Sequence, residues 1–171
     1  MSAAVRIRAA RRADAAVLLA MLRELAEYER LSDQLRATEE RLRETLFCEQ
    51  PVAEALIAER GGEPAGYALF FATYSTFLAR PGIWLEDLFV RPPHRRFGVG
   101  RRLLAAVAAR TRERGGARLE WAALDWNELA LGFYRGLGAR AQTEWITHRL
   151  VGADLERLAA EAPPVGAPPR R

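Results

Sequence analysis

Apolar residues recur along this chain with two different spacings, which together outline a series of helices and strands. From Ala13 to Tyr28 the apolar residues fall three or four positions apart: Leu18, Met21, Leu22, Leu25 and Tyr28. This spacing puts them on one face of a helix that packs against a core. The same spacing predicts further helices over residues 103–111 and 129–137. Thr38, followed by two glutamates, has the residue types of a helix N-terminus and predicts one more helix.

Short apolar stretches bounded by turn residues predict the strands. They cover residues 5–9, 53–60, 65–72, 83–90, 118–124 and 142–150. The turn sequence Gly61-Gly62-Glu63-Pro64 joins two of these strands and predicts a hairpin, which requires antiparallel neighbours. A strand, two helices and a hairpin, followed by alternating strands and helices, predict an α/β (α+β) fold with a mixed, mostly antiparallel sheet.

The length of the chain and its last residues suggest its domain organisation. A chain of 171 residues is long enough for one domain and too short for two. Residues 161–171 contain four prolines and no apolar periodicity, so we expect a single domain over residues 1–160 and a flexible Pro-rich tail after it. No stretch of about 18 apolar residues occurs, and the N-terminus is charged early. We therefore expect a cytoplasmic protein without a membrane span.

Charge and cysteine content exclude several classes of function. The net charge is +4, but 26 basic residues are interleaved with 22 acidic ones and form no basic arm. This pattern speaks against a nucleic-acid binder, although a small polyanionic ligand remains an alternative to a solvated surface. Cys48 is the single cysteine, so the chain has no internal disulfide and no thiolate metal site. Without a nearby histidine, Cys48 is not proposed as a nucleophile.

The strongest chemical signal is Arg95-Arg96-Phe97-Gly98-Val99-Gly100-Arg101, between a predicted strand and a predicted helix. The two glycines allow close approach of the main chain, and N–H groups at a helix start form a concave site for an anion. Arginines on both sides, including Arg102, add positive charge. The motif matches neither a Walker A loop nor a dinucleotide fingerprint. It indicates a pyrophosphate site, the alternative being a plain helix start flanked by surface arginines.

The spacing Arg95-x-x-Gly98-x-Gly100 resembles the pyrophosphate motif of the GNAT superfamily of N-acetyltransferases. The segments 84–90, 125–127 and 133–134 match that family in order and spacing, and the resemblance spans about residues 4–150. Leu25–Glu29 and Thr73–Thr76 are similar to its diamine and thialysine branch. The resemblance implies a splayed sheet with helices on both faces. It also implies transfer of acetyl from acetyl-CoA to a primary amine of a small cationic acceptor, a homodimer, and no metal.

Glu86 and Asp87 interrupt an otherwise apolar strand. Side chains alternate along a strand, so the two acids are expected on opposite faces, and each needs a partner if buried. An acceptor ammonium has a pKa of about 10, so roughly one molecule in a thousand is a free amine at neutral pH. A carboxylate can hold the cation and accept its proton through a water. The resemblance implies this role for Glu86, whereas for Asp87 we favour a structural pairing with arginines or backbone donors.

The resemblance implies that Tyr134 is the second catalytic residue. A phenol is protonated at neutral pH and can donate to the departing thiolate, although a tyrosine here could also simply pack. The N–H groups of Leu88, Phe89 and Val90, in a splayed or bulged strand, would face the acetyl carbonyl and stabilise an oxyanion. The full cofactor-binding set is Leu88, Phe89, Val90, Arg95, Arg96, Phe97, Gly98, Val99, Gly100, Arg101, Asn127, Ala130 and Tyr134.

The implied acceptor-binding residues are Tyr28, Glu29, Glu86 and Trp121. Glu29 could equally be an exposed residue at a helix end, and Trp121 could only pack. The segment Tyr74-Ser75-Thr76 lacks the acid of the diamine enzymes and is closer to the thialysine enzymes, which favours a lysine-like acceptor over a long polyamine. Other acceptors, namely an aminoglycoside or a protein N-terminus, stay open. So does a non-catalytic module that binds acyl-CoA.

Overall fold

The computed structural model describes residues 3–164 and residue 166, in two compact units that meet between Ala123 and Leu124. The first unit comprises β1 (Val5–Ala9), α1 (Ala15–Tyr28), α2 (Glu39–Leu46), β2 (Glu54–Arg60), β3 (Glu63–Ser75), β4 (Arg80–Val90), α3 (Val99–Glu113) and β5 (Arg118–Glu120). Short 3-10 turns lie at Arg12–Asp14, Ser32–Gln34 and Pro92–His94. The second unit contains α4 (Glu128–Arg135) and α5 (Gly152–Ala160). A single domain over residues 1–160 stays a prediction.

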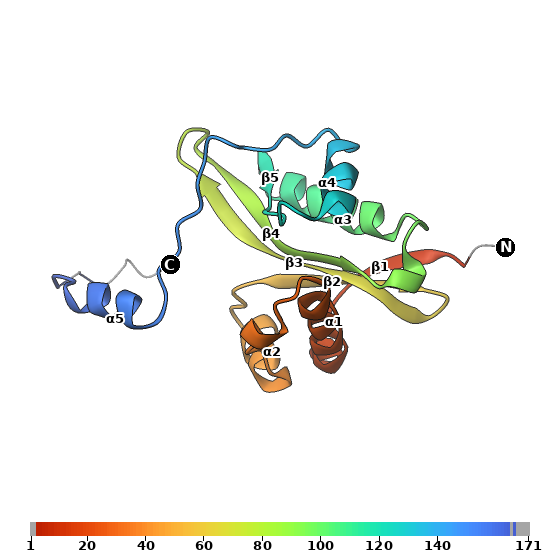
Figure 1. The fold of residues 1–171 in the computed structure, drawn as a ribbon, viewed down its shortest axis with the longest axis horizontal. Helices are drawn as coiled ribbons and strands as arrows, with labels where there is room; N and C mark the ends of the chain where they lie inside the picture. Colours follow the sequence, from red (N-terminus) through yellow and green to blue (C-terminus); the bar gives the residue numbers. More distant parts are fainter. Residues whose placement is uncertain (1–2, 165, 167–171) are drawn as a thin grey trace. The chain divides into compact units, whose positions relative to one another are not determined.

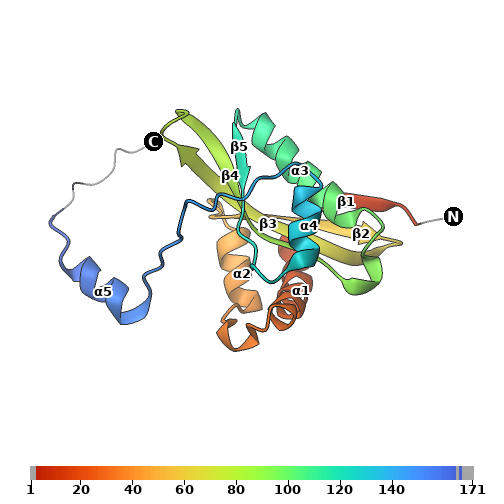
Figure 2. The ribbon, with the colours of Figure 1, turned by 45° about the horizontal axis from the view of Figure 1, so that its top comes forward.

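The first unit is built on one sheet with the strand order β1-β2-β3-β4-β5. The first four strands pair antiparallel, and β5 pairs parallel to β4. Helices α1 and α2 lie on one face of this sheet and α3 lies on the other (Figures 1 and 2). The predicted mixed, mostly antiparallel sheet with helices on both faces is confirmed.

The face under α1 and α2 forms the larger core. Helix α1 buries Leu18, Met21 and Leu25 of the predicted stripe, whereas Leu22 and Tyr28 are half-buried. The buried residues pack with residues of α2, β2, β3 and β4: Leu42, Leu46, Ile57, Tyr67 and Phe89. Thr38 caps α2 as expected, because its Oγ1 accepts a hydrogen bond from the Arg41 N–H at 3.2 Å. This core therefore fixes the end of α1 against β3 and β4.

Strand β4 contains a β-bulge at Glu86. Leu69 pairs with Asp87, whereas the next residue of β3, Phe70, pairs with Leu85, so Glu86 has no partner on β3. An extra residue shifts the alternation of side chains by one. Leu85 and Phe70 are therefore buried toward α3, while Asp87 turns toward α1 together with its partner Leu69.

The second unit departs most from the sequence prediction. Residues 142–150 form neither strand nor helix, so the predicted last strand is wrong. Trp145 and Ile146 of this segment are 73% and 79% exposed, and within the second unit no described strand is present to pair with their backbone. Helix α5 was not predicted, although Leu155, Leu158 and Ala159 have helical spacing, and none of its residues is buried. Strand β5 is also shorter than expected and ends at Glu120.

The proline-rich end lies partly outside the structure. Residues 161–164 and 166 are exposed and form no regular element, whereas residues 165 and 167–171 of the predicted tail lie outside the described residues. Among the described residues, no helix combines the length and the hydropathy that a bilayer span requires.

Candidate active site

The loop between β4 and α3 has the geometry of an anion site. It ends at Gly98, whose φ of 76° lies in the left-handed region, and Arg96 also has a positive φ of 65°. Helix α3 then begins at Val99 without a side-chain cap, so its first N–H groups are available as donors. Alternating backbone conformations before a helix N-terminus turn successive N–H groups toward one concave surface, where the helix dipole favours negative charge.

Two arginines anchor this loop to the rest of the first unit. Arg91 binds both carboxylate oxygens of Glu24 on α1, with its Nη2 2.6 Å from Oε1, and it also donates to the Pro64 carbonyl at 3.0 Å. Arg95 donates to the Val90 carbonyl at 3.0 Å, and its guanidinium lies 4.9 Å from the centre of the Tyr28 ring. Both arginines therefore hold the loop, and a contact of Arg95 with phosphate stays a prediction.

The remaining arginines of the loop are placed differently. Arg96 and Arg101 are exposed and form no ion pair among the described residues, so their charge can act on a ligand. Phe97 lies under the guanidinium of Arg60, 3.5 Å from the ring centre to the Arg60 Cζ. Arg60 at the end of β2 is thus a loop neighbour that the sequence did not reveal.

The end of β4 beside this loop has an open edge. Within the first unit, β5 pairs with β4 only at Gly82, Ile83 and Trp84. Beyond Trp84, Leu88 to Val90 pair with β3 on one side only. In an antiparallel pair every second residue turns its N–H away from the partner strand, here β3. This stretch of β4 therefore presents unpaired N–H donors on the side where β5 no longer runs beside it. The predicted splay and bulge both occur at this point in the sheet.

Three carboxylates gather near the bulge, toward α1. Glu86 is exposed and accepts a 2.9 Å hydrogen bond from Trp84 Nε1, while Asp87 is more buried and Glu29 ends α1. Burial raises the pKa of Asp87 to about 6; the charges of Glu86 and Glu29 act in the same direction, and the Tyr67 hydroxyl opposes them. Burial also raises the pKa of Glu29. None of the three carboxylates forms an ion pair among the described residues.

Tyr134, in the second unit, is held by a well-capped helix. The Asn127 side chain caps α4 by accepting a hydrogen bond from the Ala130 N–H at 3.2 Å. At the other end, the Tyr134 carbonyl accepts from the N–H groups of Leu137 and Ala139 at 3.0 and 3.2 Å. The half-buried Tyr134 ring packs against Phe133 with ring centres 5.3 Å apart. Helix α4 and its N-cap residue therefore carry all three cofactor residues predicted for this unit.

Comparison with known proteins decides the family. A sequence model of the acetyltransferase (GNAT) family matches residues 19–139. The chain belongs to this family. A thialysine N-epsilon-acetyltransferase from Sus scrofa is 41% identical over 170 residues, covering 93% of this chain and 99% of that protein. An L-ornithine N5-acetyltransferase from Arabidopsis thaliana is 45% identical over 94 residues, 55% of this chain and 41% of that protein.

A solved structure confirms the fold of this acetyltransferase. An integron cassette protein from V. cholerae superimposes with a TM-score of 0.76 at 26% identity, covering 93% of this chain and 98% of that one. The GNAT fold and the transfer of an acetyl group to an amine, both implied by the sequence resemblance, are thereby confirmed. The matched residues 19–139 include the loop between β4 and α3 (residues 91–98, the anion loop), the bulge and α4, so the family match crosses the boundary between the two units.

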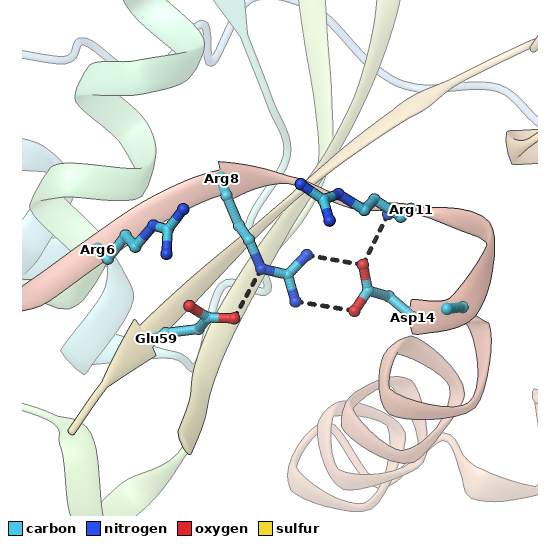
Figure 3. Close-up of a pocket in the computed structure, with 6 residues that line it drawn as sticks. Arg6, Arg8, Arg11, Asp14 and Glu59 are labelled. Atoms are coloured by element: carbon cyan, nitrogen blue, oxygen red, sulfur yellow. Dashed lines mark hydrogen bonds and ion pairs between the residues drawn. The ribbon is translucent and has the colours of Figure 1, made fainter. Parts of the chain in front are cut away.

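A second charged cluster of the acetyltransferase, beside β1, has carboxylates that are already paired with an arginine. It lines a pocket of about 270 Å³ beside β1 and consists of Arg6, Arg8, Arg11, Ala13, Asp14 and Glu59. Arg8 binds Asp14 through two hydrogen bonds of 2.7 and 2.8 Å and Glu59 through one of 2.6 Å (Figure 3). Hydrogen bonding to Arg8 lowers the pKa of Asp14. Both carboxylates are already paired, so this pocket does not suit an ammonium.

We expect Asp14→Asn to lower the free energy of unfolding at pH 7 by about 1.5–3 kcal/mol, the usual contribution of hydrogen bonds to charged groups. The pKa of Asp14 is lower in the folded protein than in the unfolded chain. The stability that its carboxylate contributes is therefore fully present above the pKa of the unfolded chain, and it is lost as the pH falls through the pKa of the folded protein. Urea denaturation from pH 7 to pH 2 should show the two proteins converging in acid. As a control, Glu113→Gln breaks the exposed Arg110–Glu113 ion pair and should lower the free energy of unfolding much less. A constant difference at every pH would contradict this account.

Two residues near the candidate site were missed from the sequence. Tyr67 is fully buried on β3, and Arg60 contacts Phe97. Tyr67 lies in a stretch of β3 that is buried on both faces, and Arg60 ends β2 beside an irregularity in the register, so no local pattern could have identified them. Of the predicted acceptor residues, Tyr28, Glu29 and Glu86 lie in the first unit beside the loop or the bulge, and Trp121 follows β5 half-buried.

Proposed function

We propose that this acetyltransferase transfers the acetyl group of acetyl-CoA to the side-chain amine of a lysine-like amino acid such as thialysine. The observation that carries the proposal is the group of carboxylates on the α1 side of the bulge, Glu29, Glu86 and Asp87, in a chain that is basic overall. A cationic acceptor would supply the charge that this group lacks. The 41% identity with a thialysine N-epsilon-acetyltransferase over nearly the whole chain supports this acceptor class.

The anion loop fits the pyrophosphate of CoA. Its left-handed Gly98, the uncapped start of α3 and the unpaired charges of Arg96 and Arg101 suit a polyphosphate better than a neutral ligand. In this proposal residues 95–101 hold the pyrophosphate, and the open-edge N–H groups among Leu88, Phe89 and Val90 bind the acyl oxygen. When bound, acetyl-CoA supplies the activated acyl group.

The proposed catalytic residues come from both units. Glu86 holds the acceptor ammonium beside the bulge, and Tyr134 donates a proton to the leaving thiolate. Asn127 and Ala130 complete the cofactor set on α4. This assignment treats residues 1–160 as one catalytic domain, which the family match across residues 19–139 supports.

A homodimer is also part of the proposal. The second unit exposes a series of large apolar residues, which favours burial against another chain. They are Trp145, Ile146, Leu150, Val151, Leu155 and Leu158. The cytoplasmic location expected from the N-terminal sequence stays a prediction.

A panel of amines tests the acceptor class. With acetyl-CoA present, we expect thiol release to be fastest, in kcat/KM, with thialysine, lysine or ornithine and slower with a long polyamine. Norleucine has nearly the length of lysine without the terminal amine, and it should give no more than background. A preference for an aminoglycoside or a peptide N-terminus would replace the proposed acceptor. Tight CoA binding without turnover on any amine would instead indicate a binding module.

A further inference from the structure

The bulge gives Glu86 and Asp87 different surroundings on the same side of the sheet. Glu86 is exposed, and its carboxylate is held by the Trp84 indole N–H. Asp87 comes after the bulge and pairs with Leu69, which packs against the α1 core. Asp87 therefore lies deeper than Glu86, between the exposed carboxylate and the core.

Tyr67 lies next to Asp87 on the neighbouring strand. Its strand partner is Phe89, two residues beyond Asp87, so Tyr67 and Asp87 are diagonal neighbours on the α1 face, and each affects the pKa of the other. Tyr67 is fully buried, and its hydroxyl has no hydrogen bond of good geometry among the described residues. A buried hydroxyl without a settled partner is uncommon, because desolvation makes it costly. The Asp87 carboxylate lies close enough for the hydroxyl to lower its pKa, so Tyr67 and Asp87 together form a pair of acceptors that a bound donor would complete.

The charges around Asp87 identify that donor as a cation. The titratable groups that face Asp87 are Glu86 on its own strand, Tyr67 on β3 and Glu29 at the end of α1. None of them is basic, and no described arginine, lysine or histidine pairs with any of the three carboxylates. An ammonium is the ligand that satisfies both the carboxylates and the hydroxyl.

We propose that Asp87 accepts the proton of the acceptor ammonium, that the Tyr67 hydroxyl positions the Asp87 carboxylate, and that Glu86 only holds positive charge. In this step an N–H bond of the ammonium breaks and an O–H bond forms at Asp87 Oδ. The lone pair stays on nitrogen for attack, and the carboxylic acid later returns its proton to solvent. The inference rests on the proposed function, and it separates two roles that the sequence assigned to Glu86 alone.

The acid–base properties of Asp87 agree with this role. Burial raises its pKa to about 6, so the carboxylate is ionised at neutral pH and is a stronger base than an ordinary aspartate. Activity should therefore fall as pH drops through about 6, because protonated Asp87 cannot accept a further proton. The Tyr67 hydroxyl lowers the pKa of Asp87. Removing this hydroxyl should therefore raise that pKa and move the fall in activity to higher pH.

The test compares kcat/KM from pH 5 to 9.5 for wild type, Asp87→Asn, Glu86→Gln and Tyr67→Phe, with the best amine of the panel. We expect Asp87→Asn to lower kcat/KM roughly a hundredfold at pH 7. Its pH profile should also lack the acid limb, the fall in kcat/KM near pH 6. Activity should recover partly at high pH, where more of the amine arrives deprotonated. Glu86→Gln should raise KM but keep the acid limb. Tyr67→Phe should keep the limb and shift it upward.

A fluorinated lysine analogue with a lowered amine pKa separates proton acceptance from a structural effect. Such an amine arrives deprotonated, so Asp87→Asn should lose little activity with it. An unchanged acid limb in Asp87→Asn, or an equal loss with both acceptors, would overturn the proposal. If Asp87→Asn does not fold by circular dichroism, an unshifted limb in Tyr67→Phe overturns it instead. Failure of wild type with every amine would count against the proposed function, a distinct result.

Discussion

Tyr134→Phe is expected to lower kcat by about a hundredfold or more, while the affinity for CoA changes little. The substitution removes one hydroxyl and leaves the aromatic packing with Phe133, the Asn127 cap and the two hydrogen bonds to the Tyr134 carbonyl in place. Loss of one well-placed proton donor typically costs a factor of about 10² to 10⁴. Single-turnover kinetics with saturating acetyl-CoA measure the chemical step directly.

The leaving group offers a sharper version of this experiment. A thioester whose thiol is more acidic than CoA needs less help from an acid as its C–S bond breaks. The loss in Tyr134→Phe should therefore be much smaller with such a donor than with acetyl-CoA. An unchanged chemical step with acetyl-CoA, or an equal loss with both donors, would remove Tyr134 from the role of general acid.

Gly98→Val is expected to weaken CoA binding by about a thousandfold. The φ of 76° at Gly98 costs a side-chain-bearing residue about 1–2 kcal/mol, and most for a β-branched one, so the loop should abandon this conformation. An anion would then lose at least two charge-assisted hydrogen bonds of about 2 kcal/mol each, and about 4 kcal/mol corresponds to roughly a thousandfold in affinity. Isothermal titration calorimetry with CoA measures this change.

Gly115 provides a matched control for backbone strain. Its φ is 72°, and an added Cβ would meet nothing within 4 Å, as at Gly98, but it lies at the opposite end of α3. Gly115→Val should therefore lower the Tm to a similar extent and leave CoA affinity unchanged. Full CoA affinity in folded Gly98→Val would refute the placement of the pyrophosphate.

Much of the first unit could be predicted because its signals are local. The apolar stripe of α1, the Thr38 cap and the Gly61 turn each act over a few residues, and each appears where the sequence placed it. The sequence also placed a glycine-containing turn before α3, and Gly98 has the positive φ that such a turn requires; its binding of an anion stays a prediction.

The remaining features depend on pairing between distant residues. The bulge at Glu86 follows from the register of β4 against β3, so simple alternation wrongly placed Glu86 and Asp87 on opposite faces. Tyr67 lies beside Asp87 because of the same register, whereas Arg60 reaches Phe97 from the end of β2. The segment 142–150 has an apolar pattern but no described strand beside it in its unit, and an alternating pattern alone does not form a strand.

The bulge also limits how this site can change during evolution. Deleting Glu86 would remove the bulge but leave Leu85 opposite Phe70 and Asp87 opposite Leu69, so Asp87 and Phe89 would stay on the α1 side and only the exposed carboxylate would be lost. A deletion between Asp87 and Val90, by contrast, would move core side chains such as Phe89 to the other face. Gaps in alignments of proteins that share this sheet should therefore be tolerated at position 86 and should avoid the stretch from Asp87 to Val90.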